Sequence, residues 1–192
     1  MAYTTAATVK TYLGISTSTD DTIIGDCITR AQAAIDTACN RTFEATADST
    51  RYFDVPEDAD TQLIFDADCC AITSVTNGDS DALTVNTEYV TMPRNITPYF
   101  GVELTTGGGI AWAYTTTPER AIAVVGRWAY STSAPADIVQ ACIRLAAWFY
   151  HQRTNPAEGT QTIVTETGAV IVGAGLPKDV TDVLARYRRA SL

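Results

Sequence analysis

The order of hydrophobic patterns along the chain constrains its fold more than any other feature. Helix-like periodicity at both ends of the 192 residues encloses a long middle segment with the pattern of short β-strands. Such an order predicts an α+β protein rather than alternating βαβ units. We expect a bundle of N- and C-terminal helices, residues 1–43 and 132–192, with an antiparallel β domain inserted over 44–131 and a β-hairpin before the last helix.

Two helices are predicted before the β domain. Thr4 or Thr5 can cap the first helix, and Gly14 is placed to end it. The second helix begins at residue 19 or 20 and ends near Asn40, and its apolar residues recur at spacings of four and three. These residues are Ile24, Ile28, Ala31, Ile35 and Ala38.

The middle of the chain shows short apolar runs separated by turn residues. Asn77 and Gly78 predict a tight turn between two of them, because both residues tolerate a positive φ. Short strands at this spacing favour an antiparallel sheet, sandwich or small barrel. The predicted strands cover residues 51–55, 62–65, 72–75, 82–85, 88–92, 102–104 and 121–128.

The C-terminal part predicts a long helix, a hairpin and a short helix. The long helix, over 133–153, has apolar residues around almost its whole circumference and must be covered from more than one direction. Two strands, 162–165 and 169–172, then form a hairpin. Pro177 opens the last helix, in which Asp182 is spaced to pair with Arg186. The residues expected to face inward on that helix are Val180, Val183, Leu184 and Tyr187.

The charge of the chain is concentrated in one segment. Ten acidic residues and one basic residue lie between Glu44 and Asp81, and this local balance equals the net charge of −9 of the whole chain. The concentration predicts an acidic surface and argues against sequence-specific DNA binding, which depends on neutralising phosphates. The candidate surface residues are Glu57, Asp58, Asp60, Asp66 and Asp68.

No metal or cofactor is predicted. Asp58 with Asp60, and Asp66 with Asp68, have the alternate spacing that a calcium ion could bridge, although solvated acidic turns are the commoner explanation. The cysteines are odd in number and lack the spacing of a zinc site or a disulfide framework, so we expect reduced thiols. They are Cys27, Cys39, Cys69, Cys70 and Cys142.

Catalytic and targeting signals are missing from the sequence. The single histidine, His151, has no nucleophile motif around it, so we expect no enzymatic activity. The three glycines at 107–109 lack the lysine of a phosphate loop and favour a hairpin tip. Residues 1–10 lack the pattern of a signal peptide, and no run of eighteen apolar residues predicts a membrane span.

Aromatic and basic residues near the C-terminus are the candidate interface. The aromatic run at 148–150 could stack nucleobases or a sugar, but on a helix its rings spread apart, which favours a core and subunit-contact role. The arginines can act as solvated caps of the last helix or dock on an acidic partner. The candidate residues are Trp148, Phe149, Tyr150, Arg186, Tyr187, Arg188 and Arg189.

Four segments in this order resemble the head–tail connector, or adaptor, proteins of tailed bacteriophages. They are YLGISTSTDDTIIGDCITRAQAAIDTACNRTF at 12–43, AITSVTNGDSDALTVNTEYV at 71–90, APADIVQACIRLAAWFYHQR at 134–153 and LPKDVTDVLARYRR at 176–189. The resemblance is to the larger members with an inserted β domain. The segment VVGRWAYS at 124–131 departs from the more usual aliphatic strand that leads into a Gly-Tyr turn.

The resemblance implies a non-enzymatic ring, usually of twelve subunits, below the portal in the neck of the virion, after assembly in the host cytoplasm. DNA would pass through the ring without sequence-specific binding, a stopper or tail-completion protein would dock below, and residues 178–192 would engage the portal. One alternative is another neck or tail-completion protein, which ring size and portal binding would distinguish. A small hydrolase or carbohydrate-binding module is disfavoured, because no nucleophile, base and orienting group converge.

Overall fold

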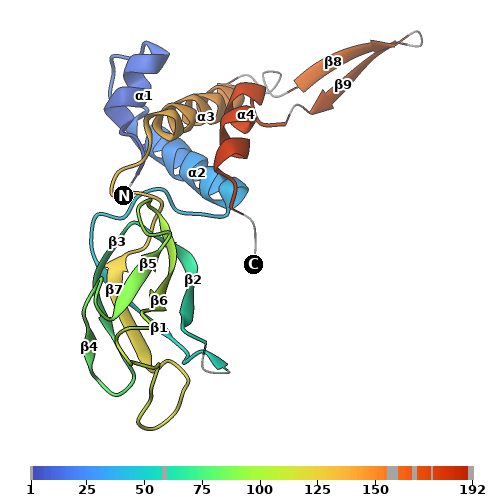
Figure 1. Cartoon of the computed structure of the whole chain (residues 1–192). Coiled ribbons are helices and arrows are strands. Elements are labelled where there is room, and N and C mark those ends of the chain that lie inside the picture. The colour runs from blue at the N-terminus through green and yellow to red at the C-terminus, as the bar shows by residue number, and fades with distance from the viewer. Residues whose placement is uncertain (1, 58–59, 155–159, 166–167, 174, 190–192) are drawn as a thin grey trace. The chain divides into compact units, whose positions relative to one another are not determined.

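The computed structural model describes residues 2–57, 60–154, 160–165, 168–173 and 175–189 (Figure 1). It confirms the predicted α+β class, with four helices and three antiparallel sheets in this part of the chain. The chain divides into two compact units. Residues 41–134 form the β unit, and residues 2–40 together with those from 135 onward form the helical unit.

The first two helices begin and end where their sequence signals lie. Helix α1 (Ala6–Leu13) is capped by the Thr5 hydroxyl, which accepts from the Thr8 amide at 3.2 Å, and it ends at Gly14 with φ 71°. Helix α2 (Asp21–Cys39) ends at Asn40, which also takes the left-handed conformation, with φ 51°. A residue in this conformation lets its own N–H satisfy carbonyl groups of the last helical turn.

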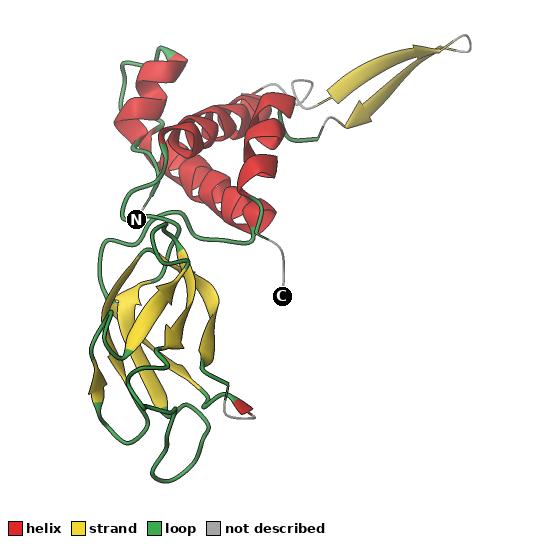
Figure 2. Cartoon of the chain, in the orientation of Figure 1, coloured by secondary structure: helices red, strands yellow, loops and turns green. Residues whose placement is uncertain are grey.

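Helices α3 (Ala136–Thr154) and α4 (Lys178–Tyr187) complete the helical unit (Figure 2). Helix α3 packs against α1, α2 and α4, and α4 also packs against α2. Its neighbours therefore cover α3 from several directions, as its nearly continuous apolar circumference predicts. None of the helices in the described residues is long and apolar enough to cross a bilayer.

The described residues of the β unit form two sheets. The four-stranded sheet has the order β1-β7-β3-β4, and the three-stranded sheet has the order β2-β6-β5. All seven predicted strands are present, and every pairing within the two sheets is antiparallel. Their bounds are β1 Ser49–Phe53, β2 Gln62–Cys69, β3 Ala71–Thr76, β4 Ala82–Leu83, β5 Tyr89–Met92, β6 Tyr99–Leu104 and β7 Ile122–Arg127.

An aromatic cluster lies in the core of the β unit. The ring centroid of Phe65 is 5.3 Å from that of Phe53 and 5.1 Å from that of Trp128. The indole N–H of Trp128 donates to the carbonyl of Ser49 at 2.9 Å, so the one polar group of this buried ring is satisfied. The core draws on both sheets: Leu63, Phe65 and Val102 come from one, and Val75, Ile122 and Val124 from the other.

Asn77 and Gly78 form a turn for a different reason from the predicted one. Neither residue has a positive φ, whereas Ser80 does, at 77°. The buried Asn77 side chain accepts from the amides of Gly78 and Ala113 and donates to the carbonyl of Ala111. A Cβ atom on Gly78 would lie 2.3 Å from the Ala113 carbonyl oxygen, so the glycine is needed for this close backbone approach.

The predicted hairpin is present as β8 (Thr160–Thr165) and β9 (Gly168–Gly173), paired in register from Thr160 with Gly173 to Thr165 with Gly168. Two smaller predictions were wrong. The 107–109 glycines lie between β6 and β7, which belong to different sheets, so they do not form a hairpin tip. Asp182 pairs with Lys178, one turn earlier on the same helix, at 3.0 Å, rather than with Arg186.

Candidate functional site

The three aromatic residues at the C-terminal end of α3 have different environments. Phe149 is buried under the guanidinium of Arg30, whose carbon lies 3.9 Å from the ring centroid. The Tyr150 hydroxyl donates to Asp20 at 2.7 Å, and this hydrogen bond raises the pKa of Tyr150. Trp148 is half-buried. The rings therefore do not form a stacking platform, and only Trp148 and Tyr150 keep surface that another molecule could contact.

The apolar surface of α3 is accounted for within a single chain. Its fully or nearly buried residues point in several directions and include Leu145 and Ile138, both 0% exposed. The helices α1, α2 and α4 pack around them. The composition of α3 is thus explained by intramolecular packing, and it does not by itself require a second subunit.

Helix α4 packs against the other helices through its apolar face, and hydrogen bonds at its C-terminal end add to this packing. Val180 and Leu184 are buried. The Tyr187 hydroxyl lies 2.8 and 2.9 Å from the two carboxylate oxygens of Asp137 on α3. The Arg189 amide donates to the carbonyl of Cys39, the last residue of α2, at 2.8 Å. Tyr187 is therefore an internal contact of the helical unit, and its place in an interface stays a prediction.

The C-terminal arginines separate into two kinds. Arg186 and Arg188 are exposed, and neither forms an ion pair with a described residue. Arg189 is half-buried and held by its main chain at the end of α2. Arg186 lies in the last turn of α4 and Arg188 follows the helix as its extended C-cap residue, so both present positive charge next to the contacts described above.

Asp66 and Asp68 do not form the predicted pair of carboxylates on one side of a strand. The register of β2 against β6 shifts between Ile64 and Cys69, and this irregularity interrupts the alternation of side chains. Asp66 is exposed and pairs with Arg51 at 2.5 Å. Asp68 is 7% exposed and pairs with Arg41 at 3.4 Å. Asp68 is therefore removed from the candidate acidic surface, and the alternate spacing does not place these two carboxylates on one exposed side of the strand.

Several other carboxylates of the β unit hold its own backbone and side chains. Asp48 accepts hydrogen bonds from the Thr73 hydroxyl and from Arg127, and the Thr73 bond is the main reason that the pKa of Asp48 is lowered. Asp60, which is exposed, accepts from the Gln62 amide at 3.0 Å. Glu57 is exposed, and Asp58 lies outside the described residues.

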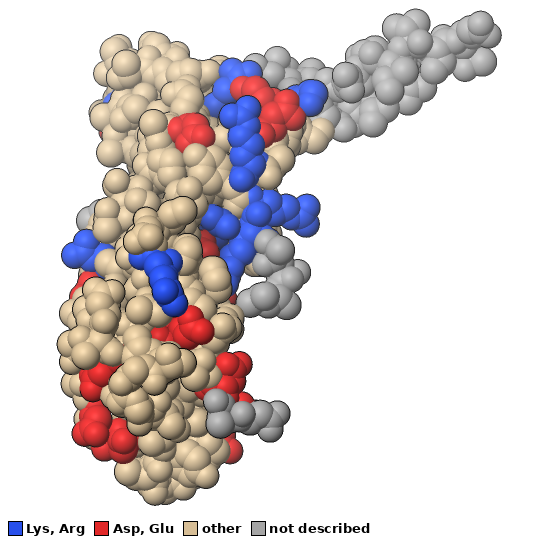
Figure 3. Space-filling model, in the orientation of Figure 1, with Lys and Arg blue, Asp and Glu red and all other residues tan. Residues whose placement is uncertain are grey.

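The charge difference between the units is nevertheless large. The β unit contains thirteen acidic and five basic residues, a net charge of −8, while the remainder of the chain contains nine acidic and eight basic residues, a net charge of −1. On the face drawn in Figure 3, the acidic side chains of the β unit form small groups with uncharged surface between them. On this face the acidic side chains are therefore distributed rather than gathered in one patch.

Metal and redox chemistry receive no support from the described residues. No group of three or more His, Cys, Asp or Glu side chains among them is arranged to hold a metal ion. Burial raises the pKa of the Cys69 thiol to about 11 and that of Cys142 to about 12, so both are protonated and unreactive at neutral pH. His151 is exposed, and its ring stands edge-on to Tyr150 with centroids 6.0 Å apart.

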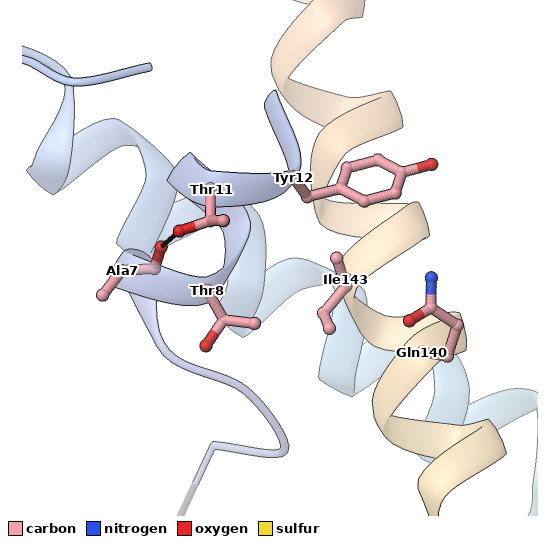
Figure 4. Close-up of a pocket in the computed structure, with 6 residues that line it drawn as sticks. All are labelled: Ala7, Thr8, Thr11, Tyr12, Gln140 and Ile143. Atoms are coloured by element: carbon pink, nitrogen blue, oxygen red, sulfur yellow. Dashed lines mark hydrogen bonds between the residues drawn. The ribbon is translucent and has the colours of Figure 1, made fainter. Parts of the chain in front are cut away.

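A shallow groove of about 450 Å³ lies between α1 and α3 (Figure 4). Tyr12, which is 46% exposed, forms part of its wall, and Gln140 and Ile143 of α3 form the opposite part. Arg144 donates to the Tyr12 hydroxyl at 3.2 Å and pairs with Asp179 of α4, and these two bonds, led by that with Tyr12, raise the pKa of Arg144. This chain of contacts ties the rim of the groove to α4.

Sequence reasoning missed this groove and the exposed apolar residues of the β unit. A signal for the groove was available, because the eight-residue α1 has too few apolar positions to bury both its faces and contains one buried residue, Val9. The exposure of Ile64, Ile96 and Phe100, between 44% and 68%, had no such signal. It depends on strand register and loop conformation, which composition does not determine.

Comparison with known proteins adds a family and a shared fold. A family model described as head completion protein (HCP) matches residues 2–190. A chain from the neck of an empty gene transfer agent (GTA) particle, computed with C6 symmetry, is 14% identical with a TM-score of 0.58, and the match covers 97% of this chain and 90% of that one. A chain from the virion of a native GTA particle is 15% identical with a TM-score of 0.57 and the same coverage. No curated protein sequence matches.

Proposed function

This chain belongs to the head completion protein family and is a structural head–tail adaptor, and from that premise we propose that it forms a closed ring, of about twelve copies, in the neck of a tailed phage particle. In this proposal the ring sits below the portal and provides the surface to which a stopper or tail-completion protein attaches. The observation that carries the proposal is the extent of the family match, which includes both units and runs from residue 2 to residue 190.

The fold of the two GTA chains supports this position. Both likenesses extend over nearly the whole of this chain, so the helical and β units occur together in proteins from a particle neck and a virion. We assign this chain to the neck of the mature particle on that basis. A structural role of this kind requires no catalytic group, and we propose that the protein acts without enzymatic activity.

For the portal contact we propose the exposed arginines of the C-terminal segment. Arg186 lies in the last turn of α4 and Arg188 directly after it, and α4 packs against α2 and α3. An arginine can bind a carboxylate through two parallel hydrogen bonds, a geometry that lysine cannot reproduce. Each exposed pair contributes only about 0–1 kcal/mol, but a ring repeats the contact in every subunit.

The charge of the β unit supports passage of DNA without binding. A net charge of −8 on one unit repels phosphate wherever that unit borders the channel. The protein also lacks an excess of positive charge that could neutralise several phosphates at once. We therefore propose that DNA slides through the ring and that the protein makes no sequence-specific contact with it.

The portal contact can be tested by reversing charge without disturbing the packing of α4. The double variant Arg186→Glu/Arg188→Glu leaves Leu184 and Tyr187 in place, so the helical unit is expected to stay folded. We expect it to lose attachment to portal-bearing heads in copurification, because two attractive contacts per subunit become repulsive. Electron microscopy of the protein alone and mixed with portal then reports whether a ring forms.

The matched control is Arg186→Lys/Arg188→Lys, which keeps the charge but removes the two-bond geometry, and we expect it to bind weakly. If the glutamate variant copurifies with heads at the wild-type level, the portal contact lies elsewhere on the protein. A wild-type protein that forms no ring on the portal would contradict the proposed function as a whole.

A further inference from the structure

The hairpin formed by β8 and β9 differs from every other sheet in the described chain. It has two strands of six residues and no third strand on either side. Alternate residues of a strand direct their N–H and C=O groups to opposite sides, so about half of these groups face away from the partner strand. Neither strand has one of the helices as a principal packing neighbour. The outer edges of the hairpin thus remain available for backbone pairing.

The composition of the two strands leaves these free edges without protection against pairing with a strand of another chain. Their sequences, TQTIVT and GAVIVG, contain no charged residue and no proline, and half of the twelve residues are Ile, Val or Ala. Proteins normally protect a free edge with charges, prolines or a covering element, because such an edge pairs readily with another strand. An isolated two-stranded hairpin is also only marginally stable in water. The hairpin therefore has the properties of an element that becomes stable by pairing.

We propose that β8 and β9 pair with the same hairpin of neighbouring copies, so that the ring is joined by a continuous antiparallel sheet. This inference rests on the proposed ring. The β8 edge of one copy would bind the β9 edge of the next, which is a head-to-tail contact of the kind that generates closed rings. A neighbouring copy is the fitting occupant because it supplies a strand of equal length and equal lack of charge at every position around the ring.

Ring closure would remove all free edges at once. A ring of about twelve copies gives a cylinder of about 24 strands, which at a strand spacing of about 4.8 Å and a tilt of about 40° is roughly 50 Å across. That width leaves room for a DNA duplex to pass. The absence of charge in the paired strands suits such a sheet, because charges of one sign repeated in every copy would repel one another around the ring.

The pairing can be tested with two variants at one outward-facing position of β9. Hydrogen-bonded pairs alternate along the hairpin from Thr165 and Gly168, so Ile171, opposite Thr162, directs its N–H away from β8. Ile171→Pro removes this outward N–H and leaves the hydrogen bonds within the hairpin in place, whereas Ile171→Val keeps both the N–H and a β-branched side chain. We expect Ile171→Pro to fold into both units, by circular dichroism, but to lose rings in electron micrographs of the protein mixed with portal, and Ile171→Val to form rings at the wild-type yield. Ring formation by Ile171→Pro at that yield would overturn the proposal.

Amide hydrogen exchange provides a readout that does not depend on the variants. In the wild-type monomer, we expect about half of the β8 and β9 amides to exchange at solvent rates, and in the ring we expect all of them to be protected. Unprotected outward amides in a ring verified by microscopy would contradict hairpin pairing while leaving the proposed function intact. Protection that appears only when a stopper protein is added would also overturn it, because the strand would then come from that partner.

Discussion

The two units of this adaptor use their charged residues in different ways. In the helical unit, with a net charge near zero, single polar bonds join the ends of separate helices, as Tyr187 does with Asp137 and Tyr150 with Asp20. In the β unit, with a net charge of −8, carboxylates fix nearby backbone, as Asp60 does with the Gln62 amide, and also bind residues of neighbouring strands, as Asp48 does with Thr73 and Arg127. Polar contacts therefore join separate helices in one unit, and fix turns and neighbouring strands in the other.

This difference shows why counts of charge and of apolar residues predict surfaces poorly. The acidic segment suggested one exposed surface, but Asp68 is buried and Asp66 is paired with Arg51. The apolar circumference of α3 suggested a subunit contact, but the other helices of the same chain cover it. In both cases residues that the sequence alone suggested for contacts with other subunits make their contacts within the same chain.

The largest expected effects come from truncating one core residue in each unit. Phe65→Ala, in the aromatic cluster of the β unit, should lower the free energy of unfolding by about 3–5 kcal/mol, and Leu145→Ala in α3 by about 2–5 kcal/mol. Both residues are 0% exposed. Urea denaturation followed by circular dichroism measures these losses. An unchanged free energy of unfolding for Leu145→Ala would remove this residue from the core and contradict the packing described for α3.

A smaller effect is expected from the bond that fastens α4. Tyr187→Phe removes the hydroxyl that contacts both carboxylate oxygens of Asp137, so that a charged acceptor loses its donor. We expect a loss of about 1–3 kcal/mol in urea denaturation. The control is Tyr114→Phe in the β unit, where the ring is 52% exposed and the change should stay within about 0.5 kcal/mol. Equal effects of the two substitutions would show that the hydrogen bond between Tyr187 and Asp137 does not stabilise the packing of α4.

One buried thiol in each unit predicts a common loss of stability at alkaline pH. Because burial raises the pKa of Cys142 to about 12 and of Cys69 to about 11 from a usual value of 9.0, the folded protein favours the protonated thiols. Their contribution is complete below pH 9 and is lost as the pH rises toward the folded values. Unfolding measured between pH 8 and 11 should show this decline, and Cys142→Ala should make it shallower. An unchanged slope in that variant would exclude Cys142 as a cause.

The smallest effect is expected on the acidic side, in the β unit. Hydrogen bonds from Thr73 and Arg127 lower the pKa of Asp48 below 3.8, so its stabilising contribution is present above that value and is lost as the pH falls through the folded pKa. Replacing the donor, Thr73→Val, should raise the pKa of Asp48, as measured by NMR titration of its carboxyl carbon. The carboxylate is solvent-exposed, so little change in the melting temperature at pH 7 is expected. A titration identical to that of the wild type would show that Thr73 does not hold the carboxylate in solution.

Local signals allowed most of the secondary structure to be predicted, whereas side-chain partners could not be. Gly14 and Asn40 end their helices as expected, because the left-handed conformation that ends a helix is adopted mainly by glycine and asparagine. The arginine partners of Asp66 and Asp68 depend on a register shift in β2, and no local pattern reports such a shift. The candidate interface had the same limitation, since Tyr187 belongs to the apolar stripe of α4 whether that stripe meets α3 or another protein.

The central claim is that this protein forms a closed ring around the path of the DNA in the particle neck. Electron cryomicroscopy of native DNA-filled particles, reconstructed around the axis of the portal, tests it most directly. We predict density for both units repeated with rotational symmetry about that axis, immediately below the portal. Density for the chain at a position without ring symmetry around the DNA would contradict the account.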